Sequence, residues 1–373
     1  MNPHFTRELP TRLYETESSV ASVAAAHGFA PTQIADFSLN VNPFGPPASA
    51  VAAATAVLGL SHAYPDVQLA ALRRAVAQRH ATPEAHLLFG AGLDDVIKQI
   101  LHAWVGEGEA VLVHLPTFPR YELEARLRGC RVVAVTGPAP WRVDLEAIAD
   151  ALARERIALA FLCSPNNPTG EKIDMPAIAA LARRFPETLF VVDEALLDPR
   201  EPGVTSLVGE LGNVVQLRTF SKYYGLAGFR IGYAHASAGL VAIAERGRPP
   251  FNVALPSEAA AVAALADRAF LDAAFARFRA EADRFCAALA PLAWLRLRGR
   301  HANMLLLEVR DRTARDLQRA LEARAIVIAD AACFGGMDGH EAIRISLQDE
   351  RRNDRLLAAL AELGPGAGAE SSR

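Results

Sequence analysis

Short apolar runs alternate with segments of helical periodicity along the middle of the chain. Stretches with apolar residues every three or four positions lie at Leu93–Val105, Pro119–Arg128 and Met175–Arg184. Continuous apolar runs predict buried strands at Leu87–Phe89, Ala110–His114, Val132–Val135, Ile157–Cys163, Leu189–Val192, Val214–Leu217 and Ile231–Ala234. Strands buried on both faces that alternate with helices indicate a mainly parallel sheet covered on both sides. We therefore predict an α/β protein.

The pattern changes after Pro256, where an α+β unit of different style begins. We expect a long amphipathic helix at about Ser257–Leu289, which is either continuous or interrupted once, and a last helix from Arg351. Between them we expect strands at Leu295–Leu297, Met304–Val309, Ile326–Ile328 and Ile343–Leu347 and a helix at Ala314–Ala323. These changes predict an N-terminal segment at 1–46 that packs on the small domain, a large domain at 47–254 and a small C-terminal domain at 255–373. The final GPGAGAESSR has the composition of a disordered end.

Composition excludes several classes of function. The chain has 373 residues, is 51% hydrophobic and carries a formal net charge of -3, which favours neither nucleic acid nor an anionic membrane as a partner. Its four cysteines are scattered without a C-x-x-C pair, which argues against a zinc site and a disulfide framework. The N-terminal residues lack the apolar core of a signal peptide, and no apolar run approaches membrane-spanning length. We expect a cytoplasmic protein.

Two segments place polar groups after predicted strands. In FGAGLDD, Phe89–Asp95, a strand passes through two glycines into a helix whose first turn holds Asp94. Backbone N–H groups at such a helix start bind anions, although a purely structural turn is the commoner role of this pattern. In FLCSPNNPTG, Phe161–Gly170, a buried strand ends near Asn166 and Asn167, at the edge where open α/β sheets bind ligands. A plain loop uses the same residue types.

Two further segments supply charged groups. In LFVVDEALLDP, Leu189–Pro199, Asp193 follows an apolar strand, so its buried carboxylate needs a cation, a protonated ring nitrogen or an internal salt bridge. In LRTFSKYYGLAGFRIGY, Leu217–Tyr233, Lys222 stands among hydroxyl side chains, glycines and Arg230. A lysine at a strand edge inside a site can lose its proton and attack carbonyl groups. A solvated surface lysine is the alternative, and the flanking residues argue against it.

Together these segments closely resemble fold-type I pyridoxal 5′-phosphate (PLP) enzymes, in the branch of histidinol-phosphate aminotransferase and threonine-phosphate decarboxylase. The resemblance spans nearly the whole chain, through SLNVNPFGPP, AYPD, GAGLDD, SPNNPTG, VVDEA, RTFSKYYGLAGFRIGY and EAIRISL. It implies the aspartate aminotransferase-like fold, with a mainly parallel seven-stranded sheet in a large domain and a small α+β domain. It also implies a PLP-dependent enzyme of the class I/II aminotransferase family that acts on a small-molecule amino acid, with a 2-oxo acid as the second substrate if the reaction is a transamination.

The resemblance assigns three catalytic residues. Lys222 would form the Schiff base with PLP, Asp193 would pair with the pyridinium nitrogen and make the ring an electron sink, and Asn167 would bind the ring hydroxyl oxygen. Phe118, in HLPTFPRY, would stack on the ring face. The cofactor phosphate would be held by Leu93, Asp94, Thr219, Ser221 and Arg230.

The resemblance further implies a homodimer with shared active sites, because Tyr64 in AYPD matches a tyrosine that reaches the phosphate from the neighbouring subunit. Arg344, in AIRISL, matches the arginine that grips the substrate carboxylate bidentately, and Asn42 is a second substrate-binding candidate. No metal site is expected.

The chain departs from these relatives after the D-E-A motif and at its N-terminus. Leu196 stands where most relatives carry a tyrosine that bonds the ring hydroxyl. Threonine-phosphate decarboxylases also tend to lack that tyrosine, so its absence favours a decarboxylase of that type. Their N-terminal His-Gly-Gly segment, however, has no counterpart in YETESSV, Tyr14–Val20.

A further departure concerns the substrate. Near Ile328 both kinds of relative usually carry an arginine for the substrate phosphate, whereas this chain has Ala329 and Asp330. We therefore expect a substrate without a phosphate. Alternatively, Arg298, Arg300 or another basic residue takes the place of the missing arginine.

Three hypotheses about function follow. The first is an aminotransferase, since the full set of PLP-handling residues is present. The second is a decarboxylase of the threonine-phosphate decarboxylase type or another α-carbon lyase, which Leu196 and the SKYYGLAG segment favour. The third, a non-catalytic regulator with a PLP fold, is weak because no helix-turn-helix pattern precedes NPFGPP.

Overall fold

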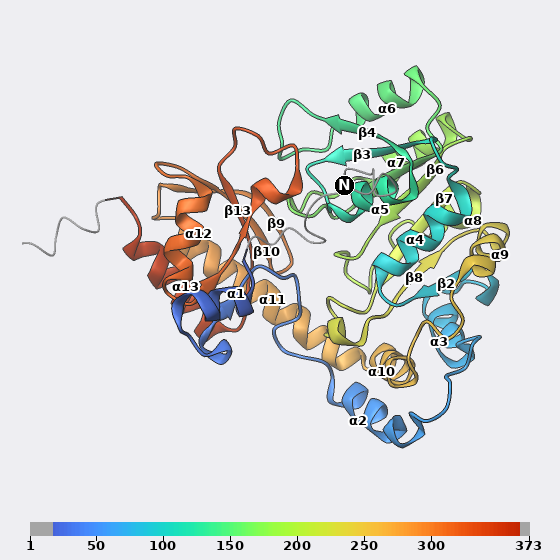
Figure 1. The fold of residues 1–373 in the computed structure, drawn as a ribbon, viewed down its shortest axis with the longest axis horizontal. Helices are drawn as coiled ribbons and strands as arrows, with labels where there is room; N and C mark the ends of the chain where they lie inside the picture. Colours follow the sequence, from blue (N-terminus) through green and yellow to red (C-terminus); the bar gives the residue numbers. More distant parts are fainter. Residues whose placement is uncertain (1–17, 366–373) are drawn as a thin grey trace, which may run out of the picture.

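A computed structural model describes residues 18–365 and contains a central seven-stranded sheet (Figure 1). Its strand order is β2-β8-β7-β6-β5-β3-β4. The strands are β2 Leu87–Gly90, β3 Ala110–Leu115, β4 Arg131–Thr136, β5 Leu159–Cys163, β6 Leu189–Asp193, β7 Val214–Thr219 and β8 Gly232–His235. β8 runs antiparallel to both of its neighbours, and the other adjacent pairs are parallel. The prediction of a mainly parallel seven-stranded sheet is confirmed.

Helices cover both faces of this sheet. One face is covered by α4 Leu93–Trp104, α5 Arg120–Arg128 and α9 Ala238–Gly247. The other face is covered by α6 Leu145–Arg154, α7 Met175–Arg184 and α8 Thr205–Glu210. Successive side chains of a strand point to opposite faces, so in β5 Leu159 and Phe161 pack in the first layer and Ala160 and Leu162 in the second. This two-sided burial explains the continuous apolar runs.

A third cluster lies at the β2 edge of the sheet. It is formed by α2 Ala48–Val57, α3 Ala70–His80 and α10 Leu255–Ala266, which pack with Phe89, Phe220 and Tyr233. The long helical pattern predicted at Ser257–Leu289 is divided here, because Asp267 ends α10 and its carboxylate accepts a hydrogen bond from the N–H of Phe270 in the next helix. The helices α2 and α3 were not among the sequence predictions.

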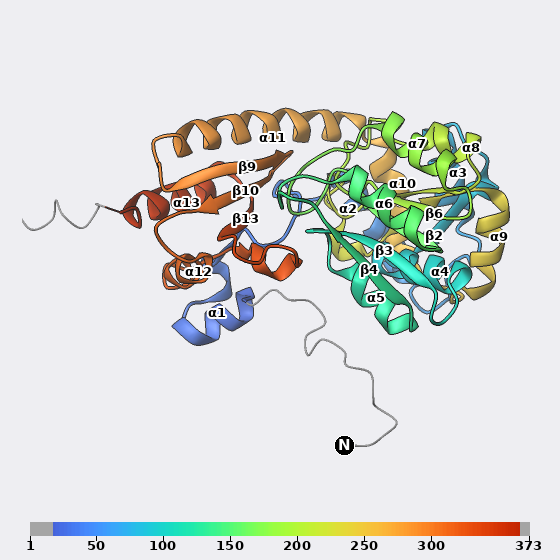
Figure 2. The same ribbon diagram turned by 90° about the horizontal axis from the view of Figure 1, so that it is seen from above.

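The C-terminal part forms a second, four-stranded sheet with the order β12-β13-β10-β9, called here the four-stranded unit. Its strands are β9 Leu295–His301, β10 Met304–Val309, β12 Ala329–Asp330 and β13 Ala342–Ser346. Its helices are α11 Arg268–Leu289, α12 Ala314–Glu322 and α13 Glu350–Glu362. Figure 2 shows α11 lying along this unit and reaching toward α10.

The N-terminal part of the described chain packs against the four-stranded unit. β1 Ala35–Asp36 pairs in parallel with β11 Ile326–Val327, and α1 Val20–His27 places Val23 in a small cluster with Val327. Short 3-10 turns occur at Pro31–Gln33, Leu58–Leu60, Glu84–His86, Ala227–Phe229 and Ala331–Phe334. The His-Gly-Gly comparison at 14–20 and the predicted disordered end fall mostly outside residues 18–365. Within those residues, no helix is long and apolar enough to cross a membrane.

Candidate active site

A cavity of about 280 Å³ lies at the carboxyl ends of β5, β6 and β7, beside Arg344 of β13. This volume is close to the lower end of the range for small-molecule sites. Ten of the predicted site residues line it: Leu93, Asp94, Phe118, Asn167, Asp193, Thr219, Ser221, Lys222, Arg230 and Arg344. Parallel strands deliver their carboxyl ends to one edge, which is why motifs far apart in sequence meet there.

Lys222 supplies the amine of the cavity. The other lysines of the sequence, Lys98 and Lys172, have side chains that are 49% and 46% exposed and pair with carboxylates. Burial lowers the pKa of Lys222 to about 8; the nearby Arg344 lowers it too, and Asp193 opposes the shift. At pH 7 a lysine with this pKa is neutral in about a tenth of the molecules, far more often than a solvated lysine, so its amine can act as a nucleophile and as a base.

Asp193 ends β6 and supplies a buried carboxylate. Its Oδ2 accepts a hydrogen bond from the Tyr121 hydroxyl at 2.6 Å, and its Oδ1 accepts one from the N–H of Ala195 at 2.8 Å. Burial raises the pKa of Asp193, whereas these two donors and the charge of Lys222 lower it. Tyr121 is fixed by stacking on Phe161, with ring centroids 4.6 Å apart. The arrangement favours a positively charged group beside this carboxylate.

The first turn of α4 forms a cradle for an anion. Gly92 has φ +86°, and a Cβ at this position would overlap the guanidinium of Arg230. A Cβ at Gly232 would lie 2.8 Å from the backbone nitrogen of Leu93. The glycines therefore let a helix N-terminus, an arginine and the hydroxyl of Thr219 approach one another. Unpaired N–H groups at the start of a helix and an arginine together bind phosphate well.

Asn166 and Asn167 differ in what they do. Asn166 holds its own loop, since its Oδ1 accepts from Thr117 at 2.8 Å and its Nδ2 donates to the carbonyl of Pro116 at 2.9 Å. Asn167 lines the cavity, and its Oδ1 accepts a hydrogen bond from Nη1 of Arg344 at 3.1 Å. Arg344 also donates to the carbonyl of Ser38. The guanidinium is therefore held from two sides at the cavity wall.

Two predicted residues do not line the cavity. Tyr64 is 82% exposed and stacks on Phe251, with ring centroids 4.5 Å apart. Asn42 is buried, and its Nδ2 donates to the carbonyl of Tyr223 at 2.9 Å, so it holds the backbone next to Lys222.

Several residues that line the cavity were missed by the sequence reasoning. They are Leu39, Asn40, Val41, Tyr121, Cys163, Ala195 and Ala227. Tyr121 left a signal, because it lies in the same HLPTFPRY segment as Phe118, three positions further on. The apolar residues left none, since an apolar side chain in a loop is usually only packed.

The arginine that the relatives usually carry near Ile328 is not replaced by Arg298 or Arg300 in the cavity. Arg298 pairs with Glu308 at 2.8 Å and lies over the ring of Trp141, and Arg300 pairs with Asp283 at 2.7 Å. Neither lines the cavity, where Arg230 and Arg344 are the arginines among the described residues. Asp330 lies in β12 and accepts a hydrogen bond from the N–H of Ala332 at 3.0 Å.

Comparison with known proteins agrees with this geometry. The model of the family "Aminotransferase class I and II" matches residues 32–360. Histidinol-phosphate aminotransferases from Symbiobacterium thermophilum and Roseiflexus castenholzii are 38% and 35% identical, over 88% and 92% of this chain and 90% and 93% of their own. The crystal structure of histidinol-phosphate aminotransferase from Sinorhizobium meliloti in complex with pyridoxal-5'-phosphate is similar, with a TM-score of 0.82 and 29% identity over 92% of this chain and 94% of that one.

The chain belongs to the class I and II aminotransferase family. It is a PLP-dependent aminotransferase, similar to histidinol-phosphate aminotransferases, and its substrates are an amino acid and a 2-oxo acid. The residues of the cavity fit the cofactor: an anion cradle for its phosphate, the buried carboxylate of Asp193 for its ring nitrogen, and the amine of Lys222 for its aldehyde.

Proposed function

We propose that the chain transfers an amino group from an amino acid to a 2-oxo acid with Lys222 as the residue that holds PLP covalently and then moves the proton at the α-carbon. The observation that supports this proposal is that Lys222, a lysine with a lowered pKa, and Asp193, a buried carboxylate, line the same cavity. PLP, when bound, supplies an electron sink that makes an α-carbon bond of the amino acid breakable.

The cofactor side of the cavity has a defined role for each residue. Asp193, held by Tyr121 and Ala195, would pair with the ring nitrogen and keep it protonated. The α4 cradle, with Arg230, would hold the phosphate, and Phe118 would cover one face of the ring. The amine of Lys222 would act as the acid and base at the α-carbon of the substrate.

On the substrate side of the cavity, the proposal depends on two residues, Arg344 and Asn167. Arg344 would bind the substrate carboxylate, because its guanidinium is buried, oriented by Ser38 and Asn167, and matches the fork of a carboxylate. Asn167, whose Oδ1 is used by Arg344, would donate its amide N–H to the ring hydroxyl oxygen. Arg344 therefore links substrate recognition to the cofactor.

Absorbance spectroscopy of the PLP-loaded protein tests this function. Addition of amino donors should convert the cofactor to its amine form, and a 2-oxo acid should convert it back. Histidinol phosphate is one donor to test, because the relatives above are named histidinol-phosphate aminotransferases. Unphosphorylated amino acids form the second set of donors, because the sequence predicts a substrate without a phosphate. Release of carbon dioxide without any need for a 2-oxo acid would instead establish a decarboxylase.

We further propose a homodimer with shared sites. Tyr64 is 82% exposed and stacks on Phe251, which is 40% exposed. Leu58 and Leu60, a few positions earlier in the chain, are 54% and 52% exposed, and such apolar exposure is typical of an interface. Co-expression of Lys222→Ala with Tyr64→Ala tests this: hybrid dimers should regain activity because one of their two sites carries both native residues. Absence of regained activity in a verified hybrid would contradict shared sites.

We also propose a cytoplasmic location. Its support is that all four cysteines are free thiols in the described structure, as in a reducing compartment. Fractionation of cells that express the chain tests this directly.

A further inference from the structure

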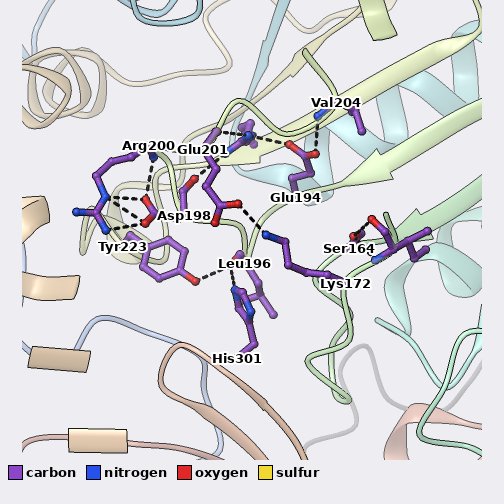
Figure 3. A network of polar contacts seen from close by, with 12 residues as sticks. Ser164, Lys172, Glu194, Leu196, Asp198, Arg200, Glu201, Val204, Tyr223 and His301 are labelled. Carbon is purple, nitrogen blue, oxygen red and sulfur yellow. Dashed lines mark hydrogen bonds and ion pairs between the residues drawn. The ribbon is translucent and has the colours of Figure 1, made fainter. Parts of the chain in front are cut away.

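The turn that follows β6 is connected to the four-stranded unit at the carbonyl group of Leu196 and, separately, by the ion pair of Arg200 with Asp272 in α11. Leu196 lies three residues after Asp193, and its buried side chain lines the cavity. Its carbonyl oxygen accepts hydrogen bonds from the Tyr223 hydroxyl and, at 2.7 Å, from Nε2 of His301. Figure 3 shows the two rings meeting at this carbonyl. Tyr223 follows Lys222, whereas His301 is the last residue of β9.

The His301 ring must donate in this contact. Burial lowers the pKa of His301, and the charge of Lys172 lowers it further, whereas the Leu196 carbonyl, Glu201 and Asp198 oppose the shift. The ring is therefore neutral at neutral pH. A carbonyl oxygen only accepts, so the single ring hydrogen of the neutral form lies on Nε2.

The strand that carries His301 also touches the second loop of the cavity. A Cβ at Gly299 would overlap the carbonyl oxygen of Thr169, and a Cβ at Gly170 would lie 2.9 Å from the carbonyl carbon of Arg300. Backbone therefore lies directly on backbone where β9 meets the loop that holds Asn167. The end of β9 is thus fixed against the body of the molecule at the same edge as Leu196.

The residues around Leu196 in the turn have other anchors (Figure 3). Glu194 forms a buried ion pair with Arg218 at 2.8 Å, and Glu201 pairs with Lys172 at 2.7 Å. Asp198 is held by Arg200. The contact from His301 therefore acts on Leu196 itself, which lines the cavity.

We propose that His301 is a positioning residue for substrate recognition: through the Leu196 carbonyl it fixes the apolar wall, formed with Leu39 and Val41, that meets the substrate side chain. The placement of the four-stranded unit thereby sets the shape of the pocket. This inference rests on the proposed function, because the wall matters only if an amino acid enters the cavity.

The test compares His301→Leu, which removes the donor, with His301→Gln, whose amide can still donate to the carbonyl. Arg296→Ala, an exposed change on the same strand, is the control. The probes are L-phenylalanine, histidinol phosphate and L-alanine. For His301→Leu we expect the KM of the two larger donors to rise about tenfold, with kcat and the KM of L-alanine within about twofold of the native enzyme. His301→Gln should restore most of the difference.

A double-mutant cycle shows whether His301 acts through Leu196. In a Leu196→Ala background, His301→Leu should change the KM of L-phenylalanine by less than about twofold, because the wall is already absent. Additive effects, equal losses for all three donors, or failure of His301→Gln with unchanged thermal unfolding would overturn the proposal.

The failure of the proposed function is a separate result. Native protein that converts no donor across a broad panel of amino acids, these three included, would remove the aminotransferase reaction. The His301 proposal is then decided by the dissociation constants of L-phenylalanine and L-alanine, followed through the absorbance of bound PLP in native protein and His301→Leu. Equal ratios of the two constants in both proteins would overturn it.

Discussion

The two sides of the cavity are built in different ways. The cofactor side is made from the ends of neighbouring strands of one sheet and the first turn of α4, so Asp193, Thr219 and Lys222 come from short, contiguous motifs. The substrate side joins segments far apart in the chain: Arg344 is held by Ser38, 306 positions away, and Leu196 by His301, 105 positions away. A side built from local motifs is hard to change, whereas a side built from distant contacts is altered by small shifts in packing. This difference explains how enzymes that share one kind of cofactor site can act on different substrates.

The largest expected effect lies on the cofactor side. Lys222→Arg should lower kcat by at least about a thousandfold, because a guanidinium does not lose its proton and cannot serve as nucleophile or base. Lys172→Arg, which keeps the surface pair with Glu201, is the matched control and should leave kcat unchanged. Steady-state kinetics with the best donor measures both. A Lys222→Arg enzyme with native activity would remove the assigned chemistry.

The substrate side should respond next, through Arg344. Arg344→Lys should lower kcat/KM about a hundredfold, because a point charge cannot reproduce the bidentate fork that Ser38 and Asn167 orient. The loss should appear mainly in KM, with the absorbance of bound PLP unchanged. Arg310→Lys, on the exposed side of the same unit, is the control. A changed cofactor spectrum with native KM would place Arg344 on the cofactor side instead.

A smaller effect on kcat is expected from Tyr121, whose hydroxyl donates to Asp193 on the cofactor side. Tyr121→Phe removes one of the two donors to Asp193 and should raise the proton affinity of that carboxylate, so that kcat falls about tenfold. Titration of the absorbance of bound PLP against pH should shift with it. Tyr224→Phe, buried but outside the cavity, should have no such effect. Identical titrations of Tyr121→Phe and native protein would contradict this role.

The smallest expected effect concerns the sheet beneath the cavity. Burial lowers the pKa of His114 to about 4, and its Nε2 accepts a hydrogen bond from the N–H of Cys163 at 3.2 Å. The unfolded chain takes up this proton near pH 6.5, so the stability is complete above that pH and falls as the pH decreases toward 4. At pH 5.5 the loss from this residue is about 1.4 kcal/mol.

His114→Gln retains an acceptor without a titrating ring and should flatten the dependence of the free energy of unfolding on pH. Urea unfolding at pH 7.5, 6.5 and 5.5 measures it. Equal slopes in the native protein and the variant would show that His114 takes no part. His80 and His235, whose pKa values burial lowers to about 3 and 4, should add to the same acid sensitivity.

The sequence predicted the parts of the molecule that depend on local pattern. The seven strands were recognisable because both of their faces are buried, and Lys222, Asp193 and Asn167 were found because each follows a strand at the ligand-binding edge. The roles of these residues stay predictions until they are measured.

The rest required the three-dimensional arrangement. No pattern in the sequence connects His301 with Leu196, or Gly299 with Thr169, because these pairs meet only when the four-stranded unit packs on the loops of the sheet. Tyr64 could be placed by resemblance alone, and in the single chain it is exposed and does not line the cavity.

The central claim is that Lys222 holds the cofactor. The chain contains only three lysines, so borohydride reduction of the PLP-loaded protein, followed by digestion and mass spectrometry, gives an unambiguous answer. The account predicts a pyridoxyl group on Lys222 and none on Lys98 or Lys172. A group on either surface lysine with Lys222 unmodified, or no attachment at all, would contradict it.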